Sequence, residues 1–131
     1  MDMGQKADSL PGLVLAYVGD AVYELYIRSY LVNKGITKVN ELHREAVRYV
    51  KATTQSRVLH QLETELQPDE IAVVKRGRNA KSGRAPKNTQ VIDYRYSTAF
   101  EALIGYMQIK GDRQRLDYIL AKAVELAERE D

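Results

Sequence analysis

Two acidic residues, Asp20 and Glu101, lie in short segments made otherwise mostly of small and apolar residues. Asp20 belongs to GDAVYE at residues 19–24, and Glu101 belongs to FEALIG at residues 100–105. An ionised carboxylate in apolar surroundings is costly unless it pairs with a cation or binds a metal, and neither segment contains Lys, Arg or His. We therefore predict that Asp20 and Glu101 bind a hard divalent cation, which prefers oxygen ligands.

Structural roles for these carboxylates remain as alternatives. Either acid could cap a turn or pair with a distant arginine such as Arg28 or Arg95. A third acid, Glu24, follows Asp20 by one helical turn. We expect Glu24 to have a structural or subunit-interface role rather than a catalytic one.

The composition limits the classes of protein to which this chain can belong. Its 131 residues, 44% of them apolar, are enough for one core and too few for two, so we expect a single domain over residues 1–131. The chain has no cysteine, which excludes disulfides and thiolate metal sites. No stretch approaches the roughly 20 apolar residues of a membrane span. We expect a cytoplasmic protein without membrane contact.

The spacing of apolar residues predicts helices and almost no strand, and therefore an all-α fold. Ser9 followed by Pro11 is a candidate N-cap for a helix over about 12–32. Further helices are predicted over about 39–51 and 54–66, from Gln67 to between Arg78 and Lys81, over about 91–109, and after the break at Gly111-Asp112, with a loop over 82–89. Asp20 and Glu101 then lie on two different helices, which must bring them together.

The predicted helix over 12–32 is apolar on two sides. Val14, Val18, Val22 and Leu25 share one face, whereas Leu13, Tyr17, Ile27 and Leu31 lie on nearly the opposite face, toward which Asp20 and Glu24 also point. In a chain this short, one face is expected to pack on its own domain and the other on a second subunit. The pattern therefore predicts a homodimer.

Positive charge is concentrated in one part of the chain. Between Lys75 and Arg95 seven basic residues stand against one acid, Asp93, for a net charge of +6, whereas the remaining 13 basic and 17 acidic residues give −4. Such a segment is an electrostatic footprint for a polyanion, although many charged loops are only solvated.

The two acidic segments resemble the catalytic-helix signatures of the ribonuclease III family. Together with KRGRNAKSG at residues 75–83 and the short chain, they are most similar to the small Mini-ribonuclease III branch, which has the nuclease domain without a double-stranded RNA-binding domain. The resemblance implies a helical nuclease domain, a homodimer formed through the signature helix, and Mg²⁺-dependent cleavage of double-stranded RNA that leaves 5′-phosphate and 3′-hydroxyl ends. Asp20 and Glu101 match the essential catalytic and metal-binding acids.

The same resemblance implies partners for other residues. Tyr17 falls where the family places an aromatic side chain that fills a socket in the partner subunit, and we expect Leu13 and Glu24 at the same interface. The implied substrate is a precursor of large-subunit (23S) ribosomal RNA, and a ribosomal protein is a further candidate partner. The predicted RNA contacts, within a basic loop over about 75–90, are Lys75, Arg76, Arg78, Asn79, Lys81, Ser82, Arg84, Lys87 and Asn88.

The chain departs from the larger members of the family at two positions. Where they have further acids, four residues before Asp20 and three before Glu101, this sequence has Ala16 and Thr98. Mg²⁺ often keeps several waters and only one or two carboxylates, so two ligands are chemically sufficient. The alternative is a catalytically silent module that binds structured RNA or a ribosomal protein as a scaffold. A helical dimer that binds only proteins would leave the basic loop unexplained.

Overall fold

The computed structural model describes residues 3–80, 85–87 and 89–129, and within these ranges it contains helices and no strand. The helices are α1 (Met3–Ser9), α2 (Gly12–Asn33), α3 (Val39–Val50), α4 (Ala52–Leu62), α5 (Pro68–Arg78), α6 (Val91–Lys110) and α7 (Arg113–Glu128), with a short 3₁₀ helix, Glu63–Glu65, after α4. The predicted all-α fold is confirmed. None of the described helices is long and apolar enough to cross a membrane.

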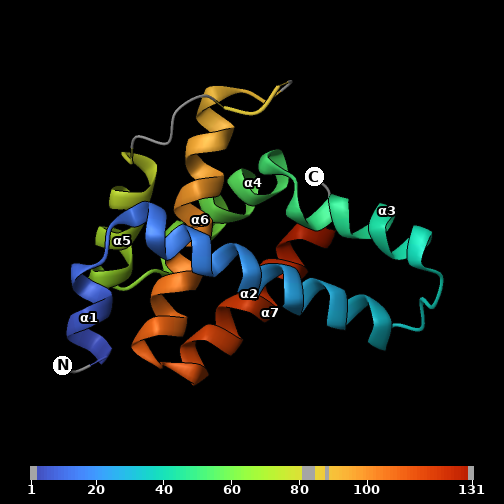
Figure 1. The fold of residues 1–131 in the computed structure, drawn as a ribbon, viewed down its shortest axis with the longest axis horizontal. Helices are drawn as coiled ribbons and strands as arrows, with labels where there is room; N and C mark the ends of the chain where they lie inside the picture. The colour runs from blue at the N-terminus through green and yellow to red at the C-terminus, as the bar shows by residue number, and fades with distance from the viewer. Residues whose placement is uncertain (1–2, 81–84, 88, 130–131) are drawn as a thin grey trace.

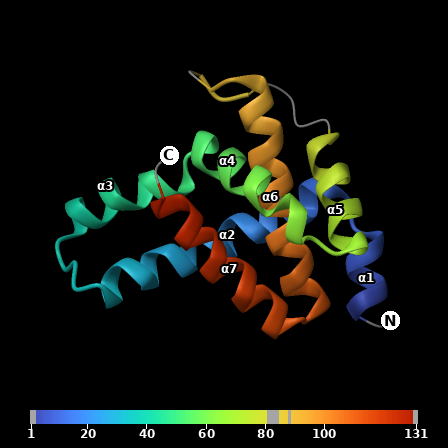
Figure 2. The ribbon, with the colours of Figure 1, turned by 180° about the vertical axis from the view of Figure 1, so that it is seen from behind.

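Helix α6 is the centre of the fold. Figure 1 shows it passing behind α2, with α5 and α1 on one side, and Figure 2 shows α7 and α4 on the opposite face of the molecule. Helix α6 contacts α1, α2, α4, α5 and α7, and its residues from Ser97 to Met107 are buried apart from Glu101, which is partly exposed. A helix that is apolar nearly all round is expected at such a central position.

The start of the chain differs from the prediction. Ser9 does not cap α2, because it ends the additional helix α1, where its hydroxyl donates to the Lys6 carbonyl oxygen at 3.0 Å. Pro11 is the residue at the N-cap of α2. The short helix is held by Ala7, which is fully buried, and it packs on α6.

Other helix ends follow the predicted signals. Pro68 is in the first turn of α5, where the Gln67 backbone N–H donates to the Glu70 carboxylate at 2.9 Å. Gly111 ends α6 at φ 84°, a left-handed conformation that glycine adopts without strain. Asp112 then caps α7 by accepting from the Arg115 N–H at 3.2 Å.

The faces of α2 were predicted wrongly. The residues that pack against the rest of the chain are Gly12, Leu15, Ala16, Gly19, Tyr23, Ile27 and Leu31, which matches neither predicted face. The packed face includes the small residues Ala16 and Gly19, and the α6 backbone comes close at Gly19. A prediction based on large apolar residues overlooks such small residues. The exposed apolar residues of α2 do not follow the predicted faces either. Val14 and Leu25 come from the first predicted face, Leu13 and Tyr17 come from the second, and Val32 belongs to neither.

Candidate active site

Helices α2 and α6 cross in backbone contact at two glycines. A Cβ atom built on Gly19 would lie 1.7 Å from the Glu101 carbonyl oxygen, and one built on Gly105 would lie 1.8 Å from the Leu15 carbonyl oxygen. Side chains on either residue would hold the helices apart. Because Asp20 follows Gly19 on α2, this close crossing places Asp20 beside Glu101.

The two carboxylates form a pair with different exposure. Asp20 is exposed, so the expected burial of this residue is wrong, whereas Glu101 is partly buried at the crossing. Burial raises the pKa of Glu101 to about 8, the negative charge of Asp20 acts in the same direction, and a hydrogen bond from Gln55 acts against it. Burial and a neighbouring carboxylate both make this group hard to ionise without a cation, and carboxyl groups with raised pKa values cluster at functional sites.

Protein cations do not neutralise this pair within the described part of the chain. Arg28, one of the two arginines considered as a partner, binds Glu24 instead, with its Nε 3.3 Å from the Glu24 carboxylate. Neither Asp20 nor Glu101 forms a salt bridge to Arg95 or to another described basic residue.

The donors suit a hard cation that keeps most of its water. Two adjacent carboxylates without a protein counter-ion fit Mg²⁺, which commonly takes one or two protein carboxylates. No third ligand joins them: among the residues that the structure describes, no three His, Cys, Asp or Glu side chains form a metal-holding group. Ala16 and Thr98 are buried, and the Thr98 hydroxyl donates to the Tyr94 carbonyl oxygen at 3.0 Å within α6.

One residue of the site was not predicted. Gln55, in the first turn of α4, donates from its Nε2 to the Glu101 carboxylate at 3.3 Å. It lies 46 residues before Glu101 in the sequence and in no recognisable motif. Only its polarity within the otherwise apolar spacing of α4 could have drawn attention to it.

The basic end of α5 packs against α6 and the start of α2. Gly77 packs against Ala99 and Ala102 of α6, since a Cβ built on Gly77 would lie 2.8 Å from the Ala99 Cα. These two alanines belong to the same turn of α6 as Glu101. The start of α2 also packs here, because a Cβ on Gly12 would lie 2.9 Å from the Arg76 carbonyl oxygen. The fold thus places the positive end of α5 next to the helices that carry both acids.

The predicted RNA contacts differ in how free their side chains are. Lys75, Asn79 and Lys87 are exposed and Arg78 is partly exposed. Arg76 is partly buried and donates to the Asp8 carbonyl oxygen at 2.5 Å, which joins α5 to α1. That contact gives Arg76 a structural task that the sequence did not predict. Lys81, Ser82, Arg84 and Asn88 lie outside the described residues.

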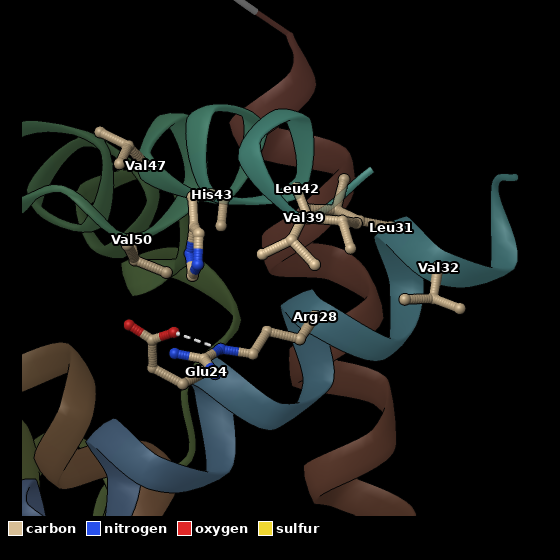
Figure 3. A pocket seen from close by; sticks show the side chains of 10 residues that line it. Glu24, Arg28, Leu31, Val32, Val39, Leu42, His43, Val47 and Val50 are labelled. Atoms are coloured by element: carbon tan, nitrogen blue, oxygen red, sulfur yellow. Dashed lines mark hydrogen bonds and ion pairs between the residues drawn. The ribbon is translucent and has the colours of Figure 1, made fainter. Parts of the chain in front are cut away.

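An apolar groove lies between α2 and α3. Its volume is about 360 Å³, and Figure 3 shows Leu42 and Val50 of α3 lining one side and His43 pointing toward α2, where Glu24 and Arg28 form their ion pair. Tyr17 does not belong to the groove. Tyr17 is 81% exposed on α2, and Leu13, one turn before it on the same helix, is also exposed. Of the three predicted interface residues, Glu24 therefore lines a groove, and Leu13 and Tyr17 present apolar surface.

The matching family model and the similar proteins that carry a functional name agree on one family. Residues 13–112 match the model of the Ribonuclease III domain. The chain is 46% identical over 129 residues to a Mini-ribonuclease 3 from Desulfitobacterium hafniense, covering 98% of this chain and 82% of that one. It is 50% identical over 118 residues to a Mini-ribonuclease 3 from Brevibacillus brevis, covering 90% and 88%. A crystal structure of a Fusobacterium nucleatum protein matches with a TM-score of 0.81 at 29% identity, covering 89% and 93%.

Proposed function

This chain belongs to the ribonuclease III family, and we propose that it is a Mg²⁺-dependent endoribonuclease that cuts double-stranded RNA at Asp20 and Glu101. The observation that carries the proposal is the placement of these two carboxylates side by side, without a protein cation, at the crossing of α2 and α6. Carboxylates at a phosphate backbone repel it unless a cation lies between them, so a protein that only binds RNA has no use for this pair.

We assign different roles to the two acids because they differ in exposure. Asp20 is exposed and would hold a cation where an RNA phosphate can reach it, whereas Glu101 is partly buried and accepts a hydrogen bond from Gln55. The chemistry that bound Mg²⁺ supplies is polarisation of the phosphodiester and a lowered pKa of the attacking water. No serine, cysteine or histidine nucleophile is needed for this reaction, and, as the resemblance implies, the 3′ oxygen would be the leaving group, which gives 5′-phosphate and 3′-hydroxyl ends.

The substrate is held by the positive segment that begins on α5. Lys75, Arg78 and Lys87 provide charge, and Asn79 provides hydrogen-bonding groups for phosphates and 2′-hydroxyls. This segment borders the helices that carry the acids, so a duplex bound to it passes the site. We assign the same role to Lys81, Ser82, Arg84 and Asn88 on the basis of their residue types.

The active form is a homodimer that pairs through α2. Val14, Tyr17, Leu25 and Val32, spaced three to eight residues apart, form an exposed apolar stripe along this helix. The stripe continues into the α2–α3 groove, which Val32 also lines. In a two-fold dimer the Tyr17 of each subunit enters the groove of the other, and two equivalent sites face one duplex.

The cellular substrate that we propose is the precursor of 23S ribosomal RNA, cut in a duplex stem during ribosome maturation in the cytoplasm. Two proteins to which the chain is similar over most of its length carry the name Mini-ribonuclease 3, which supports a ribonuclease, and the choice of precursor rests on the family resemblance of the sequence. A ribosomal protein bound to that precursor is a candidate additional partner.

The substrate class is tested with three labelled nucleic acids of one sequence: an RNA duplex, the single RNA strand and a DNA duplex. The proposal predicts Mg²⁺-dependent cutting of the RNA duplex alone, with staggered breaks, and products that ligate to a 3′-hydroxyl acceptor through a 5′-phosphate. Binding of the RNA duplex without cutting under any divalent cation would favour the silent scaffold instead.

A further inference from the structure

Gln55 is a buried amide next to the proposed site. Its side chain is only 2% exposed, in the first turn of α4. A buried amide costs roughly 1–3 kcal/mol unless its polar atoms are hydrogen-bonded, and an apolar side chain of similar size would avoid that cost. The hydrogen bonds of the Gln55 amide therefore indicate which function this side chain has.

The orientation of the Gln55 amide is set by two acceptors. Its Nε2 donates to the Val50 carbonyl oxygen at 2.9 Å, at the end of α3, and to the Glu101 carboxylate at 3.3 Å. A backbone carbonyl only accepts, so Nε2 must point toward the Val50 oxygen, and the same nitrogen then faces the Glu101 carboxyl group. Gln55 Oε1 is left buried without a partner among the described residues. The Val50 carbonyl thus fixes the amide with its donor, rather than its oxygen, toward Glu101.

We propose that Gln55 is a positioning residue that holds the Glu101 carboxylate in place for the divalent cation, an inference that rests on the metal site proposed above. The amide is neutral, so it donates a hydrogen bond to Glu101 without cancelling the charge that attracts the cation. A lysine or arginine at this position would neutralise the carboxylate and compete with the cation for it. Through Val50, the same amide ties the carboxylate to the junction of α3 and α4.

A neighbouring residue provides a matched control for the structural part of this role. Thr54 is also buried, and its hydroxyl donates to the Arg48 carbonyl oxygen at 2.8 Å. Its hydrogen bond closes the same junction between α3 and α4, but no hydrogen bond joins Thr54 to Glu101. Thr54→Val should therefore weaken the junction and leave Glu101 in place.

The test is Mn²⁺ binding to the metal-free full chain without RNA, followed by the electron paramagnetic resonance signal of free Mn²⁺. Gln55→Met keeps the length and approximate volume of the side chain and removes the donor. We expect it to bind Mn²⁺ about ten-fold more weakly than wild type, as for other residues that orient a metal ligand. Thr54→Val should bind Mn²⁺ like wild type, with a lower melting temperature. Equal Mn²⁺ affinity of Gln55→Met and wild type would overturn the proposal.

The Asp20→Asn variant separates failure of this inference from failure of the metal site. If wild type binds Mn²⁺, Asp20→Asn does not, and Gln55→Met binds like wild type, then the site is present and only the role of Gln55 is wrong. If neither wild type nor Asp20→Asn binds Mn²⁺, the proposed metal site is wrong, and so is the role proposed for Gln55. Should Gln55→Met not fold, Gln55→Asn, whose amide is one methylene short of Glu101, takes its place with the same weakening expected.

Discussion

Gly19 of α2 and Gly105 of α6 lie against each other's helices so closely that neither position has room for a Cβ atom. A Cβ on Gly19 would be 2.8 Å from the Gly105 nitrogen, and a Cβ on Gly105 would be 3.0 Å from the Gly19 nitrogen. The contact brings the backbones of the two helices together where Asp20 and Glu101 project. The geometry of the proposed site therefore depends on two residues that have no side chain.

Substitution of Gly105 by alanine should destabilise the protein. In an ordinary helix interior this change stabilises by about 1 kcal/mol, but here the new methyl group would overlap the Leu15 carbonyl oxygen. We expect a net loss of about 3 kcal/mol in the free energy of unfolding, measured by urea denaturation. Gln114→Ala, on the exposed surface of α7, is the control. A Gly105→Ala protein as stable as wild type would mean that the helices cross less closely.

Glu101→Gln should stabilise the metal-free protein at high pH. The folded chain raises the pKa of Glu101 from 4.5 to about 8, so between these values the folded state holds a proton that the unfolded state releases. The contribution of Glu101 to stability is therefore complete below about pH 4.5 and is lost as the pH rises through 8. Glutamine mimics the protonated acid without titrating.

The measurement is urea denaturation in EDTA at about pH 5 and about pH 8.5, at equal protein concentrations because a dimer unfolds in a concentration-dependent way. We expect Glu101→Gln to exceed wild type by about 1–2 kcal/mol at the higher pH, with little difference at the lower pH. An equal difference at both pH values would show that the Glu101 carboxyl does not titrate in this range.

Tyr17→Ala should weaken the dimer and leave the subunit folded. The side chain is 81% exposed on the chain itself, so its removal costs the isolated subunit little. A large aromatic side chain that fills a partner's groove is worth about 2 kcal/mol or more, which corresponds to about a 30-fold rise in the dimer dissociation constant. Sedimentation velocity over a dilution series measures it. Tyr118→Ala removes another exposed tyrosine, on α7, and should not change the dimer. A wild-type chain that is monomeric at micromolar concentration would contradict the two-site arrangement.

Removal of positive charge at Lys75 and Arg78 should weaken RNA binding in a salt-dependent way. Each phosphate contact that is lost should make the slope of log K against log salt concentration shallower by about 1. Arg76 is left unchanged, because its bond to the Asp8 carbonyl oxygen would mix a loss of stability with the loss of charge. Lys122→Ala on α7 is the control for net charge. Unchanged affinity and slope in the double variant Lys75→Ala, Arg78→Ala would remove this segment from the RNA interface.

The sequence alone was enough to predict the features that depend on local patterns. Helical periodicity, Pro68 at the start of α5 and Gly111 at the end of α6 all act within a few residues, and the two acidic segments are short and distinctive. The prediction failed where distant residues meet. Gln55 contacts Glu101 across 46 positions and Arg76 contacts Asp8 across 68. The spacing of residues along the sequence does not predict such distant contacts. The packed face of α2 was missed because Gly19 contributes to packing through the absence of a side chain.

Cleavage of a labelled RNA duplex by wild type, Asp20→Asn and Glu101→Gln, each with Mg²⁺ and then with EDTA, tests the central claim most directly. Duplex binding is measured in parallel by gel shift, so that loss of cutting can be separated from loss of binding. We predict that wild type cuts only with Mg²⁺, and that both variants bind the duplex but cut it at least about 100-fold more slowly. Wild-type rates in either variant, or cutting by wild type in EDTA, would contradict the assignment of this carboxylate pair as the metal-dependent catalytic site.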